Sequence, residues 1–271
     1  MIEAKDIKYE YIRRDDHDEV VAVETALNAV SFRIEAGEFI GIIGANGSGK
    51  STLAKHLNAL LIPEEGTVFV DDIDTSDGKM VFEVRSRVGM IFQNPDNQIV
   101  HDIVEDDVAF GPENLGIPQK ELRTRVDEAL AMVGMSESAT VSPMRLSGGQ
   151  KARVAIAGVL AMKPKCMVFD ESTAMLDPLG REEVLAEVHR LNREEGITVI
   201  WITHFAEEVV DCDSVFVMDE GELVLSGTPE EVFSEAEWLT DLGLDLPVSV
   251  SMSRELGMPV ALTAKEFVAR W

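Results

Sequence analysis

The stretch that most constrains the fold is GANGSGKST, residues 44–52, which stands between two segments of different periodicity. The preceding run FIGIIG is continuously apolar, which is typical of a strand buried on both faces. The following segment KSTLAKHLNALL places Leu53, Leu57 and Leu60 at helical spacing. A glycine-rich loop between a buried strand and a helix predicts a phosphate-binding loop, so we expect the chain to fold around a nucleotide.

The residue types of this loop suit a nucleoside triphosphate. The glycines let the backbone wrap closely, so that successive N–H groups point at the β-phosphate. Lys50 is expected to reach the β- and γ-phosphate oxygens, and the Ser51 hydroxyl to bind Mg²⁺. The expected binding residues of this segment are Gly44, Asn46, Gly47, Ser48, Gly49, Lys50, Ser51 and Thr52.

Apolar runs alternate with helical patterns along much of the chain. Buried strands are expected at VGMIF, CMVFD and TVIWIT, and helices at KELRTRVDEALAMVG and REEVLAEVHRLNREEG. Near the N-terminus, DIKYEYI and AVSFRI alternate apolar and polar residues, with the charged loop RRDDHDE between them. We predict an α/β fold of the phosphate-loop nucleotidase type, in which a mainly parallel sheet carries an antiparallel sheet at one side.

The pattern changes near Thr228. There TPEE combines a threonine cap, a proline in the first turn and a glutamate three residues after the cap, and TAKE at Thr263 repeats the cap. We expect a nucleotide-binding domain over residues 1–227, with a helical subdomain at about 95–162, and a small C-terminal helical extension over 228–271.

The charge balance limits the partners of the protein. Fifty acidic residues against 24 basic ones give a formal net charge of −26, which disfavours nucleic acid and direct adsorption to an anionic bilayer. Cys166 and Cys212 are interpreted as reduced core residues, which is typical of the cytosol. No apolar run reaches the ~18 residues of a membrane span, and the acidic start lacks a signal-peptide core. We expect a soluble intracellular protein that reaches a membrane only through partners.

Polar residues stand where buried strands end. Asp170 and Glu171 close CMVFDE, Gln93 closes VGMIFQ, and His204 closes ITVIWITH. Because an open parallel sheet binds its ligand at the carboxyl ends of its strands, these side chains are expected beside the phosphate loop. Asp170 would help to hold Mg²⁺, and Glu171 would orient or deprotonate an attacking water. The other histidines, His17, His56, His101 and His189, are expected in loops or on helical surfaces.

A second anion-binding pattern occurs in RLSGGQ, where a serine and two glycines open a helix. One nucleotide already has its phosphates held by residues 44–51. If the helices near 122–162 project from the sheet, Ser147 lies too far from Lys50 of its own chain. We therefore expect Ser147, Gly148, Gly149 and Gln150 to contact a γ-phosphate bound to another copy of this kind of protein, so that two chains arranged head to tail bury two nucleotides.

The motifs GANGSGKST, LSGGQ, CMVFDE, LDP and TH, together with Gln93, stand in the order found in ATP-binding-cassette (ABC) ATPases, and residues 1–227 resemble that family. The resemblance implies a sandwich dimer with ATP and Mg²⁺ between the phosphate loop of one chain and LSGGQ of the other. It implies that Glu171 is the catalytic carboxylate, that His204 contacts the γ-phosphate, and that Asp177 lies in a loop crossing the interface. Gln93 would lie in the segment that senses the γ-phosphate and contacts the membrane partner, and it would join the metal site. Tyr11 is similar to the aromatic residue that stacks on adenine, although Tyr9 points the same way along the strand.

A narrower resemblance comes from FQNPDNQIVHDIVEDDVAFGPENLG and DESTAMLDPLGR. The first segment is similar to one in the ATPases of energy-coupling-factor importers and of related cobalt and nickel importers. The second is similar to the first of the two ATPases of energy-coupling-factor modules, in which a serine, here Ser172, replaces the usual proline. The resemblance implies a second, non-identical ATPase, a transmembrane coupling protein, a membrane subunit that binds a micronutrient, a C-terminal dimerisation region, and a peripheral position at the cytoplasmic face of the membrane. A homodimeric cobalt or nickel importer ATPase is the nearest alternative. A cassette ATPase outside transport, a small-molecule kinase and a scaffold without turnover fit less well.

The segment from Asn94 to Glu113 carries six acidic residues and no lysine or arginine. It is either a solvated acidic face or a groove that accepts arginines from the coupling protein. For the second interpretation the expected contacts come from Asp96, Glu105 and Asp106.

Overall fold

A computed structural model describes residues 1–15 and 17–271, which form two compact units. The first unit contains residues 1–81 and 200–271, and the second contains residues 82–199. Within the predicted charged loop RRDDHDE, Asp16 lies outside the described residues. β1 extends into that segment as far as Arg14, and β2 begins directly after it at Val20, well before the predicted run AVSFRI.

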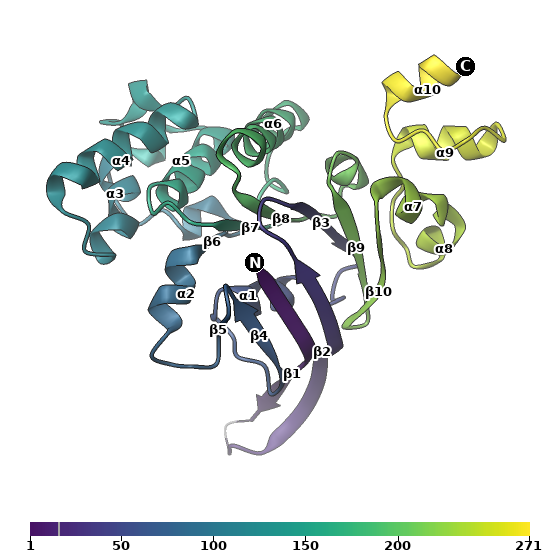
Figure 1. The fold of residues 1–271 in the computed structure, drawn as a ribbon, viewed down its shortest axis with the longest axis horizontal. Helices are drawn as coiled ribbons and strands as arrows, with labels where there is room; N and C mark the ends of the chain where they lie inside the picture. The colour runs from purple at the N-terminus through teal and green to yellow at the C-terminus, as the bar shows by residue number, and fades with distance from the viewer. Residues whose placement is uncertain (16) are drawn as a thin grey trace. The chain divides into compact units, whose positions relative to one another are not determined.

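The first unit contains the predicted antiparallel sheet. Its strand order is β2 (Val20–Ile34), β1 (Ile2–Arg14), β4 (Glu65–Val70) and β5 (Ile73–Asp74). The two long strands β1 and β2 lie side by side in Figure 1. The apolar side chains Ile2, Ala4 and Ile7 of β1 are buried. Ile2 and Ala4 follow the alternation of a half-buried strand, and a register irregularity between Ala4 and Ile7, where Asp6 has a φ of 47°, interrupts it.

The first unit also holds the strand that leads into the phosphate loop. β3 (Phe39–Gly44) is buried along its whole length and pairs in parallel with β9 (Ser214–Asp219), to which β10 (Glu222–Gly227) adds in antiparallel fashion. Helix α1 (Lys50–Leu57) follows and buries Leu53 and Leu57. The prediction for Leu60 is wrong, because the helix ends at Leu57 and Leu60 is 41% exposed beyond its cap.

The second unit combines a parallel strand pair with a group of helices. β6 (Val88–Ile91) pairs in parallel with β7 (Cys166–Asp170), and both are fully buried. Helices α3, α4 and α5 pack against one another (Figure 1). The helices that lie in or enter this unit are α2 (Val81–Arg87), α3 (Val104–Asn114), α4 (Gln119–Met132), α5 (Gly148–Leu160) and α6 (Pro178–Glu195), with short 3₁₀ turns at Pro95–Asn97, Ser136–Ser138 and Pro143–Arg145. The predicted inner faces of α4 and α6 are buried, and Gly196 ends α6 with a left-handed φ of 68°.

Strand β8 (Thr198–Ile202) has residues in both units. Its first residue, Thr198, donates its N–H to the carbonyl of Lys165 in the second unit. Just after its end, the N–H of Thr203 donates to the carbonyl of Ile42 in the first unit. The parallel, buried strands and the helices between them confirm the predicted α/β class.

After β10 the first unit continues into four short helices, drawn in yellow-green and yellow in Figure 1. Thr228 accepts from the N–H of Glu231, whose carboxylate accepts from Thr228 in turn, so the predicted capping box is present. Thr263 likewise caps the last helix. The helices are α7 (Pro229–Ser234), α8 (Ala236–Asp241), α9 (Val248–Glu255) and α10 (Ala264–Arg270), and a 3₁₀ turn at Ala206–Val209 precedes β9. Whether residues 228–271 act as a separate extension stays a prediction.

Both cysteines are core residues, as expected. Cys166 and Cys212 are buried, and burial beside Asp213 and Asp211 raises the pKa of the Cys212 thiol, which keeps it protonated. Among the described residues, no helix is long and apolar enough to cross a bilayer.

Close packing of β6 on α5 supplies a test of the second unit. A Cβ on Gly89 would lie 2.2 Å from Cγ1 of Val159, whose branched side chain cannot easily move aside. We expect Gly89→Ala to lower the free energy of unfolding by about 1–3 kcal/mol, measured by urea denaturation. Gly158→Ala on the same helix is the matched control, because the nearest atom there is 4.0 Å away. Equal stability of the two variants would contradict the packing argument.

Candidate nucleotide site

The phosphate loop of the first unit passes close to neighbouring backbone. A Cβ on Gly44 would lie 2.3 Å from the carbonyl oxygen of Met218, and one on Gly49 would lie 2.4 Å from that of Ala26. Gly49 also has a φ of 99°, which only glycine adopts without strain. These positions are therefore glycine for reasons of space, and the loop can close tightly around a phosphate group.

Lys50 is the first residue of α1 and is buried in this loop. Its ammonium donates to the carbonyl oxygens of Gly44 and Ala45, each at 2.9 Å, and lies 3.5 Å from Oγ of Ser48. The loop therefore holds a positive charge among its own polar atoms. Such a charge beside the backbone N–H groups at a helix start favours an anion. The next residue, Ser51, contributes a hydroxyl at the same helix start.

Tyr11, the expected adenine-stacking residue, lies on β1 in the same unit as the loop. Its hydroxyl lies 3.3 Å from Oγ1 of Thr52, the third residue of α1. The Tyr11 side chain is 39% exposed, so its ring has a surface available for a ligand. The structure thus brings together Tyr11 and the phosphate loop.

His204 is also in the first unit, two residues after the end of β8. With Gly44, Asn46 and Asp245 it lines a pocket of about 200 Å³, so the structure brings His204 to the phosphate loop as expected. The loop 243–245 of the C-terminal helical segment completes this pocket, a contribution that the sequence pattern did not indicate.

The turn that carries His204 is held by a buried carboxylate that the sequence reasoning missed. Oε2 of Glu208 accepts from Nε1 of Trp201 at 3.0 Å and from Oγ1 of Thr203 at 2.6 Å. Oγ1 of Thr203 in turn accepts the N–H of Phe205 at 3.0 Å. A glutamate six residues past a strand end carries no signal in the sequence by itself. A tryptophan and a threonine before it, whose donors need partners when buried, are the only hint.

The predicted catalytic carboxylate lies in the second unit. Glu171 directly follows β7, and its Oε2 accepts from Nε2 of Gln93 at 3.1 Å. Glu171 has a φ of 51°, in the left-handed region that non-glycine residues rarely adopt. Asp170, the last residue of β7, is buried. The structure therefore confirms that Gln93 and Glu171 lie together, and it holds the Glu171 carboxylate in a defined position.

The helix start that the sequence predicts as a second anion site lies in the same unit. The side chain of Ser147 accepts from the N–H of Gln150, whose amide oxygen accepts from the N–H of Ser147, so a capping box opens α5. Asp177 caps α6 with its side chain alone, by accepting from the N–H of Gly180 at 2.8 Å. Ser147, Gly148, Gly149, Gln150 and Asp177 line one pocket of about 570 Å³. Two helix starts therefore face a shared cavity.

Gly149 stands out within that pocket. A Cβ added there would meet no atom within 4 Å, and the residue does not have a left-handed φ. Nothing in the chain itself therefore requires glycine at this position. Such a glycine is suited to the close approach of a ligand or of another molecule.

The acidic residues of segment 94–113 divide into different classes. Asp107 is buried and accepts from the N–H groups of Val100 and His101 at 2.7 and 3.0 Å, so its role is structural. Asp96 pairs with Lys151 at 2.6 Å, and Glu105 pairs with Arg123 at 2.7 Å. Asp106 is exposed on the first turn of α3. Of the three residues expected to bind a partner, Asp96 and Glu105 therefore form ion pairs within the chain, whereas Asp106 is exposed on the helix surface.

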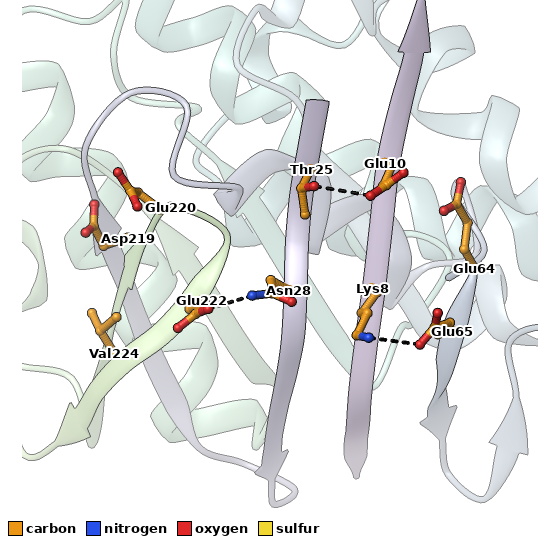
Figure 2. Close-up of a pocket in the computed structure, with 10 residues that line it drawn as sticks. All are labelled: Lys8, Glu10, Thr25, Asn28, Glu64, Glu65, Asp219, Glu220, Glu222 and Val224. Carbon is orange, nitrogen blue, oxygen red and sulfur yellow. Dashed lines mark hydrogen bonds and ion pairs between the residues drawn. The ribbon is translucent and has the colours of Figure 1, made fainter. Parts of the chain in front are cut away.

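A pocket of about 600 Å³ on the first unit has an acidic lining (Figure 2). Lys8 pairs with Glu65 at 3.0 Å, and Asn28 donates to Glu222 at 2.6 Å. The other carboxylates around it are those of Glu10, Glu64, Asp219 and Glu220. This excess of negative charge repels phosphate, so the pocket is unsuited to the triphosphate of a nucleotide.

One expectation about the histidines is wrong. His56 does not lie on a helical surface but is 0% exposed, because it occupies the inner face of α1 one residue before Leu57. Its Nδ1 lies 2.7 Å from the carbonyl oxygen of Thr52. The error arose because histidine was treated as polar, whereas burial lowers the pKa of His56 and favours the neutral ring.

Comparison with known proteins identifies similar sequences and structures among the ATPases of ABC transporters. The family described as ABC transporter matches residues 27–174. The energy-coupling factor transporter ATP-binding protein EcfA1 of Caldanaerobacter subterraneus subsp. tengcongensis is 61% identical over 230 residues, which cover 85% of this chain and 83% of that protein. The cobalt import ATP-binding protein CbiO of Syntrophus aciditrophicus is 43% identical over 270 residues, covering 98% and 93%. The solved structure of cbiO1 from Clostridium perfringens, part of the ABC transporter complex cbiONQ, has a TM-score of 0.77 at 38% identity and covers 95% of this chain and 98% of that one.

The contacts of Glu208 lead to a test of the His204 turn. Glu208→Ala leaves the buried donors of Trp201 and Thr203 without their acceptor, so we expect the free energy of unfolding to fall by about 3 kcal/mol. Urea denaturation measures this loss. Glu207→Ala is the matched control, since Glu207 is exposed in the same turn. A loss as large in the control would contradict the assignment.

Proposed function

This chain belongs to the ABC transporter family and is the ATP-hydrolysing subunit of an energy-coupling-factor importer, and from this premise we propose a division of labour among its site residues. The phosphate loop and Tyr11 bind one ATP through its phosphates and its adenine. The Ser147–Gln150 segment contacts the γ-phosphate of an ATP held by a second ATPase subunit. The open space at Gly149, which the chain's own fold does not need, is the observation that carries this proposal.

The residues fit a magnesium ion by their chemistry. Mg²⁺ prefers hard oxygen ligands, and the Ser51 hydroxyl, the Asp170 carboxylate and the amide oxygen of Gln93 are of that kind. Bound Mg²⁺ would neutralise phosphate charge that develops during hydrolysis. The hydrogen bond from Nε2 of Gln93 orients this amide, with its nitrogen toward Glu171.

Hydrolysis is assigned to Glu171. Its carboxylate accepts a proton from a water molecule whose oxygen forms a bond to the γ-phosphorus, while the bond from that phosphorus to the bridging oxygen breaks, leaving ADP and phosphate. The hydrogen bond from Gln93 and the left-handed backbone restrict the carboxylate before the reaction begins. His204 contacts the γ-phosphate from the turn that Glu208 holds.

The proposed cycle is a clamp between two ATPase subunits. ATP closes it because the γ-phosphate gains contacts from the second subunit that ADP cannot make, and only such a difference in affinity shifts an equilibrium between open and closed states. Asp177 lines the same pocket as Ser147 and Gly149, which supports its place at the subunit interface. Hydrolysis removes the contacts and reopens the clamp.

The partners follow from the family at a coarser level, and their details belong to this proposal. We propose a second, non-identical ATPase, a transmembrane coupling protein, and a membrane subunit that binds a vitamin or another micronutrient. The chain would then sit at the cytoplasmic face of the membrane through its partners. Residues 228–271 would serve dimerisation, which their exposed apolar side chains support; these include Trp238, Val248, Met252, Leu256, Val268 and Trp271.

A homodimeric cobalt or nickel importer ATPase is the second candidate, because a cobalt import ATPase aligns over nearly the whole chain. Purification of the intact complex from its native membrane, with identification of every subunit, separates the two. A second ATPase of different sequence supports the energy-coupling-factor assignment, whereas a single ATPase species supports the homodimer.

Replacement of the catalytic carboxylate tests the central assignment. Glu171→Gln keeps the size of the side chain but cannot accept the proton, so phosphate release should fall by about 100-fold or more. ATP binding should persist, and the variant should accumulate as a closed dimer that size-exclusion chromatography detects. Turnover at the wild-type rate would count against the role of Glu171.

Gly149 allows activity and stability to be separated. Gly149→Ala fills open space in the isolated chain, so its thermal stability should be unchanged or higher. In the assembled ATPase pair the added methyl group would disturb the nucleotide of the other subunit and lower phosphate release by about tenfold or more. Gly158→Ala, on the same helix, controls for a change of helix propensity. Full activity of Gly149→Ala would overturn the proposed contact.

Asp106 tests the coupling surface. We propose that this exposed carboxylate on α3 binds an arginine of the coupling protein. Asp96, which pairs with Lys151, and Glu105, which pairs with Arg123, would give up these partners and bind further arginines of the coupling protein. Asp106→Arg should weaken binding to the coupling protein by about tenfold or more. Glu195→Arg, at the exposed end of α6, is the control. Co-purification of the membrane subunits at wild-type yield with Asp106→Arg would refute the contact.

A further inference from the structure

Two aromatic rings, those of Tyr9 and His56, connect Tyr11 to the interior of the first unit. Tyr9 and Tyr11 lie two residues apart on β1, and their ring centroids are 5.1 Å apart with an interplanar angle of 81°. On its other side, Tyr9 lies 4.9 Å from the ring of His56 at an angle of 74°. Both contacts are edge to face, the arrangement that the charge distribution of aromatic rings favours.

His56 attaches this cluster to helix α1. The residue is fully buried, and its Nδ1 lies 2.7 Å from the carbonyl oxygen of Thr52. Because a carbonyl only accepts hydrogen bonds, Nδ1 must carry the proton of the ring. Burial lowers the pKa of His56, so at neutral pH the ring is uncharged and packs against Tyr9 as an aromatic group.

Thr52 contacts both ends of this row of rings. Its carbonyl oxygen meets His56, and its Oγ1 lies 3.3 Å from the hydroxyl of Tyr11. Tyr11 is therefore held at its hydroxyl end by Thr52 and at its ring by Tyr9, whose other neighbour is His56. Thr52 lies on α1, the helix that begins with Lys50 and Ser51, and Tyr9 of β1 packs against His56 of the same helix.

We propose that Tyr9 and His56 are positioning residues that fix the ring of Tyr11 relative to the phosphate loop and so set the affinity for a purine base, without touching the nucleotide. This inference rests on the proposed stacking of Tyr11 on adenine. It adds two residues that none of the motifs contains, one of which was expected to be an inert surface histidine.

The physical reason is preorganisation. Tyr11 is 39% exposed, and a half-exposed ring without lateral support loses rotamer freedom when a base stacks on it. A ring already fixed by Tyr9 and Thr52 has lost that freedom on folding, so ordering the ring on binding costs less entropy and the affinity is higher. Because Thr52 and His56, the residue that supports Tyr9, both belong to α1, the distance between the base platform and the phosphate site is fixed by the same helix.

The opposite face of β1 supplies a control. Glu10 stands between the two tyrosines, so its side chain points to the other side of the strand, into the acidic pocket of Figure 2. There it accepts from Oγ1 of Thr25 at 3.2 Å. A change at Glu10 alters the same strand and the local charge but leaves the aromatic cluster intact.

The test compares two ligands on the full-length chain. Titration calorimetry would measure the dissociation constants of MgATP, which has a base, and of magnesium tripolyphosphate, which does not. Tyr9→Leu and His56→Leu remove one ring each. For each variant the ratio of the two constants reports the base-dependent part of binding, and an error in overall folding would weaken both ligands together.

We expect Tyr9→Leu to weaken MgATP by about three- to tenfold and to leave tripolyphosphate unchanged. His56→Leu should act in the same direction. Tyr9→Phe, which keeps the ring, and Glu10→Gln, on the opposite face, should both retain the wild-type ratio. If Tyr9→Leu retains it too, or weakens both ligands equally, the positioning role is overturned, and this holds even if His56→Leu does not fold.

Tyr11→Leu separates this inference from the assignment beneath it. Loss of the stacking ring should weaken MgATP by about tenfold or more relative to tripolyphosphate. If Tyr11→Leu leaves the ratio unchanged, the proposed contact of Tyr11 with adenine is wrong. If Tyr11→Leu changes the ratio and Tyr9→Leu does not, the adenine contact stands and only the positioning role fails.

Discussion

Between β3 and α1 the backbone passes so close to the carbonyl groups of Met218 and Ala26 that a side chain fits at neither Gly44 nor Gly49. The closeness lets the loop carbonyls reach the ammonium of Lys50, which is buried at the first position of the helix. A buried positive charge at a helix start is costly to assemble for folding alone, but it suits a polyphosphate. Much of the first unit serves to hold this loop: β9 packs beside it, β1 presents Tyr11 to it, and the turn after β8 presents His204.

The second unit uses a different device, the capped helix start. Ser147 and Asp177 each satisfy the exposed N–H groups of a helix with their own side chains, and the two starts line one cavity. Gly149 beside them has open space around it. A polar surface without a side chain at its centre is suited to receive a group from outside the chain, and this supports the proposed contact with the nucleotide of a partner ATPase.

The distribution of charge decides which surfaces of the molecule suit an anion and which suit a basic partner. With a net charge of −26, the protein has little general affinity for anions, so its phosphate site depends on local geometry. The acidic pocket in Figure 2 and the acidic segment 94–113 are both unsuited to nucleotide. In the segment, however, Asp96 and Glu105 already engage cations of their own chain, which shows that carboxylates there can hold basic groups. A basic partner can use that chemistry, whereas an anionic lipid surface cannot.

The sequence by itself determined the phosphate loop, the buried strands and the helix caps at Ser147, Thr228 and Thr263. It also determined that polar side chains, those of Glu171 and His204, follow the ends of buried strands. These features depend on groups within a few residues of one another, or on apolar runs that only a buried strand satisfies. Only the tertiary structure decided that His56 faces inward, that α1 ends before Leu60, that Glu208 holds the His204 turn, and that Asp96 meets Lys151, 55 residues away. Such contacts depend on how helices and strands rotate and pack against one another. The periodicity of one segment does not indicate which other segment will pack against it.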